Sequence, residues 1–354
     1  MPRLIFGNRI RFFGLILFLS LLNGCVDNVD LPEPDVYVAG VIGDWSNHFP
    51  CFWKNGVRTD LDAEQGAATS VFVSDGRVYV AGFKGDVRLE GGTPGYWENG
   101  AWQELTKDPD DGRSVTSSIL VVAGDVYVSG YHFPQASRKK TPCYWKNGVR
   151  TDLDMGDLWN VGNGKALFIS GGDLFVAGNV TFSGCFAPCA VACYWKNGVR
   201  TELDVSDSNA NGISVSGGDV VVSGMFNSRP CYWRNGERVD LGIPDGFRFG
   251  SAQSISVSAG RIHVAGWTAL TSDNFPCVWS DGARGELNVI DASLGGWAYS
   301  LRVDGDNVYV AGSSKTSTAT VPCYWKNGDR ADLDLAGGAA AGGGWAYDIF
   351  VARK

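Results

Sequence analysis

The stretch Val308-Tyr309-Val310-Ala311-Gly312, followed ten residues later by Pro322-Cys323-Tyr324-Trp325-Lys326-Asn327-Gly328, is the unit from which this chain of 354 residues is built. Each half of the unit occurs seven times. The first half recurs at Val36–Gly40, Val78–Gly82, Val126–Gly130, Leu174–Gly178, Val220–Gly224, Ile262–Gly266 and Val308–Gly312. The second half recurs around Trp53, Trp97, Trp145, Trp195, Trp233, Trp279 and Trp325. A unit that returns at this spacing predicts a repeat architecture.

One repeat accommodates four short strands. Ser254–Ser258 alternates polar and apolar side chains, as a half-buried strand does, and Ala259-Gly260 can turn the chain into a second strand. Asp281-Gly282 is a strong hairpin signal between a third and a fourth strand. The second, third and fourth strands are expected at Arg261–Gly266, Pro276–Trp279 and Arg284–Leu287. Successive repeat tryptophans lie 44, 48, 50, 38, 46 and 46 residues apart, and four-stranded repeats of about 40–50 residues predict the blades of an all-β propeller.

The two ends of the repeat region fit each other. The first repeat begins at its second strand, at Asp35, and lacks a first strand. The C-terminal segment Trp345–Val351 closely matches Trp297–Val303, the first strand of the preceding full repeat. Pairing Trp345–Val351 with Val36–Gly40 would close a ring and remove an open sheet edge. The sequence therefore predicts a seven-bladed propeller over residues 35–354, with four antiparallel strands per blade and a composite first blade.

The N-terminal segment has the pattern of a targeting signal. Arg3, Arg9 and Arg11 precede the apolar run Phe12–Leu22, which is shorter than the ~20 residues that span a bilayer. The sequence Leu22-Asn23-Gly24-Cys25 resembles the cleavage box of bacterial lipoproteins. The resemblance implies a signal peptide at residues 1–24, acyl chains such as palmitate on Cys25, a tether at residues 25–34, and, from Val26 after the Cys, the outer membrane of the cell envelope. An ordinary secretory signal is the alternative.

Charge narrows the range of partners. Cleavage of the predicted leader would remove three Arg and change the formal net charge of the chain from −8 to −11. An acidic surface repels nucleic acid, so we expect no nucleic-acid partner. We expect a monomer that contacts the membrane only through its lipid anchor.

The sequence Trp-Lys-Asn-Gly-Val-Arg-Thr-Asp-Leu, at Trp145–Leu153 for example, resembles the HAF-type extracellular repeat family. In that family Trp-x-Asn-Gly leads into a strand that ends in Asp-Leu. The resemblance covers about a dozen residues of each repeat, and this chain has Pro-Cys-Tyr where the family tends to have His-Ala-Phe. The resemblance implies the fold and little about function.

The connections between strands divide into two kinds. The turns between first and second strands, and the Asn-Gly turns between third and fourth strands, are short and alike. The loops between second and third strands, and the loops between repeats, are long and differ from one another; examples are 83–93, 179–192 and 242–251. In an up-and-down blade both long classes emerge on the same side. We call that side the long-loop face and predict that it carries the binding residues.

Aromatic and histidine side chains are the candidate ligand-binding residues. The seven repeat tryptophans are expected in the core. Additional rings near the mouth of the channel suit sugar faces or apolar ligands, with loop packing as the alternative. Five candidates are expected in loops of the long-loop face and two at the starts of first strands: Trp45, His48, His132, Trp159 and Trp267 in loops, and Trp297 and Trp345 in strands.

Cysteines and acidic pairs are expected to be structural. Six Cys occupy the same strand position in six repeats, and Gly95 replaces them in the second. These Cys fit small buried residues, because equivalent positions in neighbouring blades lie too far apart for disulfides. Cys185 and Cys189 differ, and a disulfide between them remains open. No metal site, cofactor or catalytic residue is predicted.

The sequence leaves three functions open. The first is a non-enzymatic lipoprotein, at the surface or in the periplasm, that binds a protein or polysaccharide through the long-loop face. The second is an enzyme acting on glycans, a hydrolase or lyase, with acids such as Asp111, Asp157 or Asp291 at the channel mouth. The third is a structural envelope component. Fold alone does not decide among them.

Overall fold

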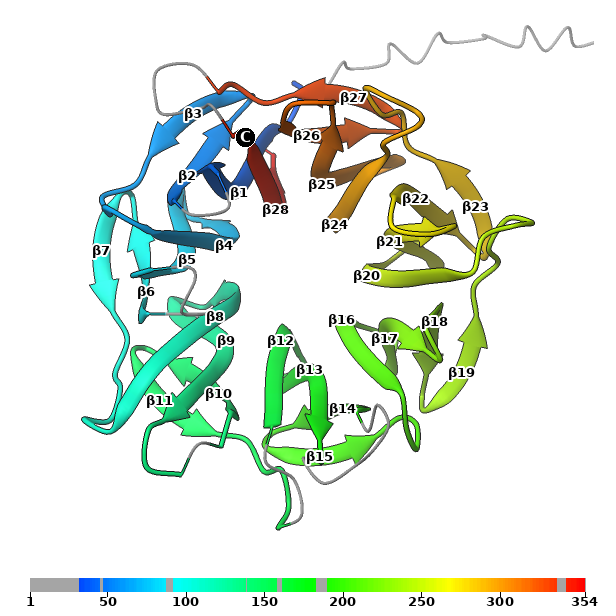
Figure 1. Cartoon of the computed structure of the whole chain (residues 1–354). Coiled ribbons are helices and arrows are strands. Elements are labelled where there is room, and N and C mark those ends of the chain that lie inside the picture. The colour runs from blue at the N-terminus through cyan, green and yellow to red at the C-terminus, as the bar shows by residue number, and fades with distance from the viewer. Residues whose placement is uncertain are drawn as a thin grey trace, which may run out of the picture. The chain divides into compact units, whose positions relative to one another are not determined.

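The computed structural model describes residues 32–44, 47–86, 92–137, 139–157, 161–182, 190–335 and 342–353. These residues form 28 strands in seven four-stranded antiparallel sheets, which stand as blades around one axis (Figure 1). The predicted seven-bladed propeller is therefore confirmed. The predicted leader 1–24 and the predicted lipidation site Cys25 lie outside the described residues. Within those ranges no helix has the length and apolar character needed to cross a membrane.

The blades are numbered along the chain, and blade 1 combines both chain ends. From blade 1 to blade 7, the innermost strands are β28 (Gly344–Ala352), β4 (Gly66–Ser74), β8 (Asp111–Val122), β12 (Val161–Ser170), β16 (Ser208–Ser216), β20 (Phe249–Ser258) and β24 (Gly296–Asp304). The second strands are β1 (Asp35–Gly43), β5 (Arg77–Lys84), β9 (Asp125–Pro134), β13 (Asp173–Thr181), β17 (Asp219–Phe226), β21 (Arg261–Ala269) and β25 (Asn307–Lys315). The third strands are β2 (His48–Lys54), β6 (Thr93–Glu98), β10 (Thr141–Lys146), β14 (Ala190–Lys196), β18 (Arg229–Arg234), β22 (Asn274–Ser280) and β26 (Thr320–Lys326). The rim strands are β3 (Val57–Asp60), β7 (Ala101–Glu104), β11 (Val149–Asp152), β15 (Val199–Glu202), β19 (Glu237–Asp240), β23 (Ala283–Glu286) and β27 (Asp329–Asp332).

The C-terminal strand closes the ring. β28 pairs antiparallel with β1, in a register that runs from Asp35 opposite Ala352 to Ile42 opposite Gly344. The strand order of blade 1 is β28-β1-β2-β3, so the predicted composite blade is confirmed. The pairing gives β1 a partner on the side where an open sheet edge would otherwise remain.

A buried carboxylate ties this closing strand to both neighbouring blades. Asp348 on β28 is 7% exposed. Its Oδ2 accepts hydrogen bonds from Ser70 Oγ at 2.6 Å and from the Val71 amide at 3.0 Å in blade 2. Its Oδ1 accepts from Ser300 Oγ at 2.5 Å in blade 7. Hydrogen bonds to a charged acceptor are the stronger kind, so Asp348 holds three blades together.

Every innermost strand contains a β-bulge at the same position. At this position one residue of each strand is skipped in the pairing with the second strand, and β8 has a further bulge at Gly112. The skipped residues are Thr69, Ser117, Lys165, Asn211, Gln253, Tyr299 and Tyr347. Beside each bulge lies the Gly that ends Val-Tyr-Val-Ala-Gly. A Cβ on Gly178, for example, would overlap the carbonyl oxygen of Asn163, and the other six glycines meet the equivalent oxygen. The repeated Gly is therefore required by the bulge.

The repeat tryptophans form the core between blades. All seven are fully buried. The indole nitrogens of five reach back to a carbonyl in the segment that leaves the previous blade, as Trp145 Nε1 does to Thr106 O at 2.8 Å. The six strand cysteines are fully buried free thiols, as the sequence predicts. Burial raises the pKa of each of these thiols, so they are neutral packing groups.

The Lys-Asn-Gly part of the repeat is a clamp within each blade. Asn147 has a positive φ of 50° in the turn between β10 and β11. Its Oδ1 accepts from the Val126 amide at 2.9 Å, and its Nδ2 donates to Asp125 Oδ1 at 2.8 Å. Lys146 Nζ lies 2.8 Å from Asp125 Oδ2. Blades 1 and 4 repeat this set with Asn55 and Asn197. The clamp holds the rim hairpin to the start of the second strand.

Blade 2 departs from the repeat in two coupled positions. Gly95 replaces the buried Cys of β6, and Trp102 on β7 stands where most blades have an Arg. The Trp102 ring fills the space that a Cβ on Gly95 would need. The ring also lies 4.5 Å from the Trp97 ring, centroid to centroid. The missing Cys is therefore the result of a larger ring packed from the next strand.

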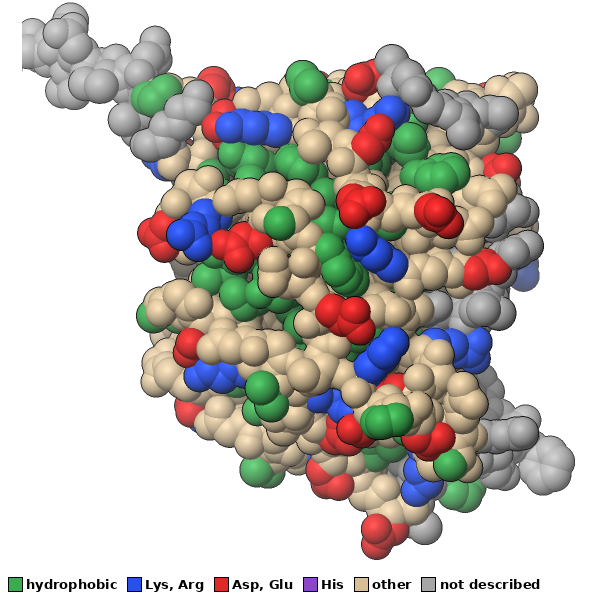
Figure 2. All heavy atoms as spheres, turned by 90° about the vertical axis from the view of Figure 1, so that its left-hand side faces the viewer, with side chains coloured by type: hydrophobic (Ala, Val, Ile, Leu, Met, Phe, Trp, Pro, Cys, Tyr) green, Lys and Arg blue, Asp and Glu red, His purple; other side chains and the backbone are tan. Residues whose placement is uncertain are grey.

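The rim carries both signs of charge. Figure 2 shows acidic and basic side chains interspersed over the side of the disc that carries β7. On a rim strand, Arg330 and Asp332 of β27 form an ion pair at 2.8 Å. A mixed, charged rim keeps the exposed outer strands from pairing with other sheets.

The long-loop face is built as predicted, but its loops are shorter. Isolated bridges join Gly92 to Ser114 and Thr320 to Gly343. These bridges place the start of a third strand beside the start of the next innermost strand. The strands extend further than the sequence indicates: β9 runs to Pro134 and β21 to Ala269, while β2 begins at His48. His48, His132 and Trp267 therefore lie in strands, and their expected placement in loops is wrong. The local reason is that these segments continue the ladder with backbone hydrogen bonds that side-chain patterns do not reveal.

We predict that Asp348→Ala weakens ring closure. Removing the carboxylate leaves two hydroxyls and one amide in the interior without their acceptor, so we expect the free energy of unfolding in urea to fall by about 3 kcal/mol. Asp240→Ala is the control, because this rim carboxylate pairs with Arg238 in a largely exposed position; there we expect a change of about 0.5 kcal/mol. Equal effects of the two variants would contradict the proposed role of Asp348.

We predict that Gly95 and Trp102 are energetically coupled. Gly95→Cys forces a side chain against the Trp102 ring and should cost about 2 kcal/mol of unfolding free energy. Trp102→Arg alone leaves a void and should also destabilise the fold. The double variant restores the Cys and Arg of the other blades, and we expect it to recover to within about 1 kcal/mol of the native chain. A double-mutant cycle from urea unfolding measures this, and strictly additive costs would contradict it.

Candidate functional site

The axial channel holds a cavity of about 390 Å³. Residues of all seven innermost strands line it, and all seven bulge residues are among them. The bulge places the side chains of Thr69, Ser117, Lys165, Asn211, Gln253, Tyr299 and Tyr347 in the lining. In β24 and β28 the bulge residue is the fourth from the start of the strand, so the ring lies toward the long-loop face, where these strands begin. One structural position thus carries hydroxyl, amine, amide and phenol groups around a single cavity.

Several members of the ring are held by hydrogen bonds. Lys165 Nζ donates to Asn211 Oδ1 at 2.7 Å. The Asn211 amide in turn donates to Ser251 Oγ at 3.1 Å and to the Ala252 carbonyl at 2.9 Å. Gln253 Nε2 donates to the same Ser251 Oγ at 3.0 Å. The polar groups on this side of the ring are therefore pre-positioned before any ligand arrives.

Two tyrosines form an aromatic side of the ring. The rings of Tyr299 and Tyr347 meet edge to face, with centroids 5.6 Å apart. Burial raises the pKa of both hydroxyls, so both stay protonated at neutral pH. The pair offers apolar ring surface and phenol groups in one cavity, which is the combination that small-ligand sites use.

None of the aromatic and histidine candidates within the described residues, which are His48, His132, Trp267, Trp297 and Trp345, lines this cavity. Trp345 is 5% exposed and packs among Val41, Ala67 and Phe83. The His48 ring lies 5.2 Å from the Trp345 ring, so the structure brings these two candidates together beside the channel wall. Tyr347, two residues beyond Trp345 and at the bulge, lines the cavity instead. The bulge is the physical reason, because it decides which residue of the strand enters the channel.

Two further tryptophan candidates are described and lie outside the cavity lining. Trp297 on β24 is partly exposed, and Lys315 Nζ lies 4.6 Å from its ring centre. Trp267 is a partly exposed residue of β21. Trp45, Trp159, Cys185 and Cys189 lie outside the described residues.

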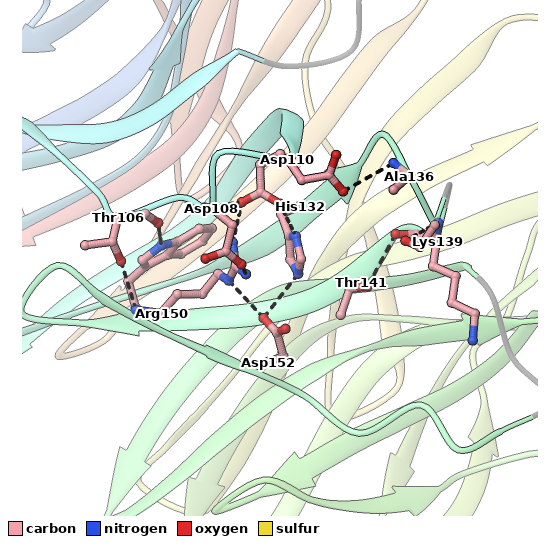
Figure 3. Close-up of polar contacts among 12 residues, drawn as sticks. Thr106, Asp108, Asp110, His132, Ala136, Lys139, Thr141, Arg150 and Asp152 are labelled. Atoms are coloured by element: carbon pink, nitrogen blue, oxygen red, sulfur yellow. Dashed lines mark hydrogen bonds and ion pairs between the residues drawn. The ribbon is translucent and has the colours of Figure 1, made fainter.

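A second polar cluster surrounds His132 in blade 3 (Figure 3). His132 is 3% exposed. Its Nδ1 lies 2.7 Å from Asp111 Oδ1, and its Nε2 lies 3.1 Å from Asp152 Oδ1. Arg150 also contacts Asp111 and Asp108, and its Nε lies 3.0 Å from Asp152. The cluster joins β8, β9, β11 and the segment that enters blade 3, and it encloses the histidine instead of presenting it to solvent.

The charges in this cluster support one another. Burial alone would lower the pKa of His132, but Asp152 and Asp111 raise it above its ordinary value. Burial alone would raise the pKa of Asp152, but His132 and Arg150 lower it. The two aspartates therefore favour the protonated imidazole, and the cluster is a set of mutually supporting ion pairs.

The acids considered for catalysis do not converge. Asp111 is turned to His132 and Arg150, Asp157 is exposed, and Asp291 accepts hydrogen bonds from Ser293. Of the described carboxylates, Asp348 alone lines the axial cavity. Its oxygens already accept hydrogen bonds from Ser70, Val71 and Ser300. Among the described residues no cluster of His, Cys, Asp and Glu has the geometry of a metal site. The cavity is thus equipped for binding by hydrogen bonds and ring contacts.

Sequence reasoning missed the bulge ring, although a signal exists. In every repeat a polar residue or Tyr stands two positions before a buried aliphatic residue, as Lys165 does before Leu167 and Tyr299 before Leu301. Aligning the repeats by that aliphatic residue would have isolated the ring. The ring is not visible in the alternation of polar and apolar residues along each strand, because a bulge shifts that alternation by one residue.

Comparison with known proteins gives distant structural matches. No protein-family model matches the sequence, and no curated protein sequence is similar to it. Trypanosoma rangeli sialidase in complex with sialic acid is similar in structure with a TM-score of 0.48 at 11% identity; the match covers 81% of this chain and 56% of that one. YCF48 bound to D1 peptide matches with a TM-score of 0.46 at 11% identity over 88% and 98% of the two chains. The β-propeller domain of the Trilobed protease from Pyrococcus furiosus matches with a TM-score of 0.46 at 10% identity over 86% and 95%. The chain spans about half the length of the sialidase, and similarity at this level describes fold class only.

We predict that the His132 cluster makes stability depend on pH. A histidine with a raised pKa in the folded state contributes stability that is fully present below its ordinary pKa of about 6.5 and is lost as pH rises through the raised value. The difference in unfolding free energy between the native chain and His132→Asn should therefore shrink from pH 5 to pH 9. His263 is the matched control, because burial lowers its pKa; for His263→Asn the native chain should lose stability, relative to the variant, as pH falls. A His132→Asn difference that is constant or grows with pH would contradict this account.

Proposed function

We propose that this protein is a non-enzymatic binding protein of the bacterial cell envelope that takes a glycan into its axial channel. The observation that carries the proposal is the bulge ring, in which seven blades present Thr, Ser, Lys, Asn, Gln and two Tyr at one equivalent position. Hydroxyl, amide and phenol groups around apolar ring surface suit a hydroxyl-rich ligand. The cavity of about 390 Å³ lies in the range of small-ligand sites.

The long-loop face is proposed as the entrance. Six of the seven bulge residues lie in the half of their strand nearer that face, and Ser117 lies near the middle of the longer β8, so a chain end or a side group of a polysaccharide entering there meets them early. The leader resemblance supports a lipid anchor on Cys25 and an outer-membrane location, which would place the channel where envelope polysaccharides are found. A protein segment inserted into the channel is the alternative ligand. A hydrolase or lyase is not supported by the cavity, because its described lining offers a single, fully engaged carboxylate.

We predict that oligosaccharide binding depends on the ring. The full chain, purified in detergent, should bind at least one member of a panel of neutral and acidic oligosaccharides in isothermal titration calorimetry. Gln253→Ala removes one pre-positioned amide and should weaken that binding about ten-fold. Arg261→Ala, in the same blade but exposed at a turn, should leave the affinity unchanged. Binding of peptides but not of oligosaccharides, or equal affinities for native chain and Gln253→Ala, would overturn the proposal.

A further inference from the structure

One corner of the axial cavity differs from the rest because it holds an ammonium group. Lys165, from β12 of blade 4, lines the cavity and contacts Asn211 of blade 5 through its Nζ at 2.7 Å. The Asn211 amide nitrogen is occupied by Ser251 and the Ala252 carbonyl, so its oxygen is fixed toward the lysine. An ammonium group has three N–H bonds, and Asn211 accepts one of them. The remaining donors lie at the wall of a cavity.

No described carboxylate balances this charge. Elsewhere in the described chain Lys54, Lys146 and Lys196 each pair with an Asp, whereas Lys165 has an amide oxygen as its polar contact. Asp348, the carboxylate of the described lining, accepts from Ser70, Val71 and Ser300. Burial, together with repulsion from Lys140, lowers the pKa of Lys165 to about 8. A partly buried cation without a counter-ion is costly, and a bound anion would remove that cost.

We propose that the Lys165–Asn211 corner binds the carboxylate of an acidic sugar unit, a uronic acid, in the glycan that the channel takes. This inference rests on the proposed function and names the ligand class. A carboxylate carries a single negative charge and accepts hydrogen bonds at two oxygens. The remaining N–H donors of Lys165 and the second Nε2 hydrogen of Gln253, which also lines the cavity, match that demand. A phosphate, with more charge and more acceptor atoms, would call for further cations at this corner.

The site couples binding to protonation. A carboxylate beside Lys165 favours the ammonium form, so ligand binding near pH 8 should be accompanied by proton uptake. Above pH 8 the free protein loses the charge that the ligand needs, and the affinity for an acidic ligand should fall. A uronate carboxylate stays ionised over this whole range, so the change reports on the protein.

The test uses a ligand pair that differs in the charge of the carboxyl group and in one methyl group per sugar unit. An oligogalacturonide and its fully methyl-esterified form are titrated into the full chain in detergent by calorimetry at pH 7. We expect the free acid to bind about ten-fold or more tightly than the ester. Lys165→Met should abolish this preference, and Lys165→Arg should retain part of it. Lys196→Met, which alters an exposed rim lysine of the same blade, should change neither affinity. Because Lys165→Met removes a buried charge, its thermal unfolding temperature should be equal to or above that of the native chain.

The outcomes separate the two proposals. Equal binding of acid and ester, or a preference that survives Lys165→Met, overturns the carboxylate site and leaves glycan binding standing. Inorganic phosphate is added as a competitor for the acid. If phosphate displaces the acid from the native chain but not from Lys165→Met, the corner is a phosphate site and the carboxylate proposal is overturned. Absence of binding by acid, ester and neutral oligosaccharides overturns both proposals. The inference is supported if the affinity of the native chain for the acid falls from pH 7 to pH 9 while the affinity of Lys165→Met stays constant.

Discussion

The close approach of two backbones at the repeated glycine is the constraint on which the rest of the structure depends. In each blade the second strand presents Gly to a carbonyl oxygen of the innermost strand, at a distance that no side chain would allow. That approach is compatible with the bulge in the innermost strand, and the bulge brings one additional residue to the channel wall. The short motif Val-Tyr-Val-Ala-Gly therefore specifies both the strand and the residue that its partner strand offers to the cavity.

The repeated residues serve the scaffold, and the unrepeated ones serve the cavity. Trp145, Asn147 and Cys143 each have a structural contact that recurs in other blades. Residues that differ from blade to blade at one position, such as Lys165 and Gln253, line the channel. A repeat protein with a constant framework can alter one such residue without disturbing the blades, because each contacts mainly its immediate neighbours. This division is the reason for placing the binding site at the axis.

Much of the fold could be predicted from the sequence, whereas most of the candidate site could not. The pairing of Trp345–Val351 with β1 followed from matching chain ends, and the buried position of the strand cysteines followed from their spacing to Trp. The site depends on details that residue patterns do not carry. Trp345 is buried and Tyr347 lines the channel because a bulge lies between Ala346 and Asp348. His132 is enclosed because Arg150 and three aspartates from separate strands and loops meet around it, which a sequence without tertiary contacts does not show.

The position of β28 has a consequence for how the protein is made. The strand that completes the first blade follows every other strand in the chain, so β1 has no inner neighbour while the other six blades emerge. During that interval the nascent chain presents an unpaired strand edge to other copies of itself. The burial of Asp348 against blades 2 and 7 can occur only when β28 arrives. Closure of the ring thus waits for β28, and a product cut short before Gly344 would keep an unpaired strand edge that quality-control proteases could recognise.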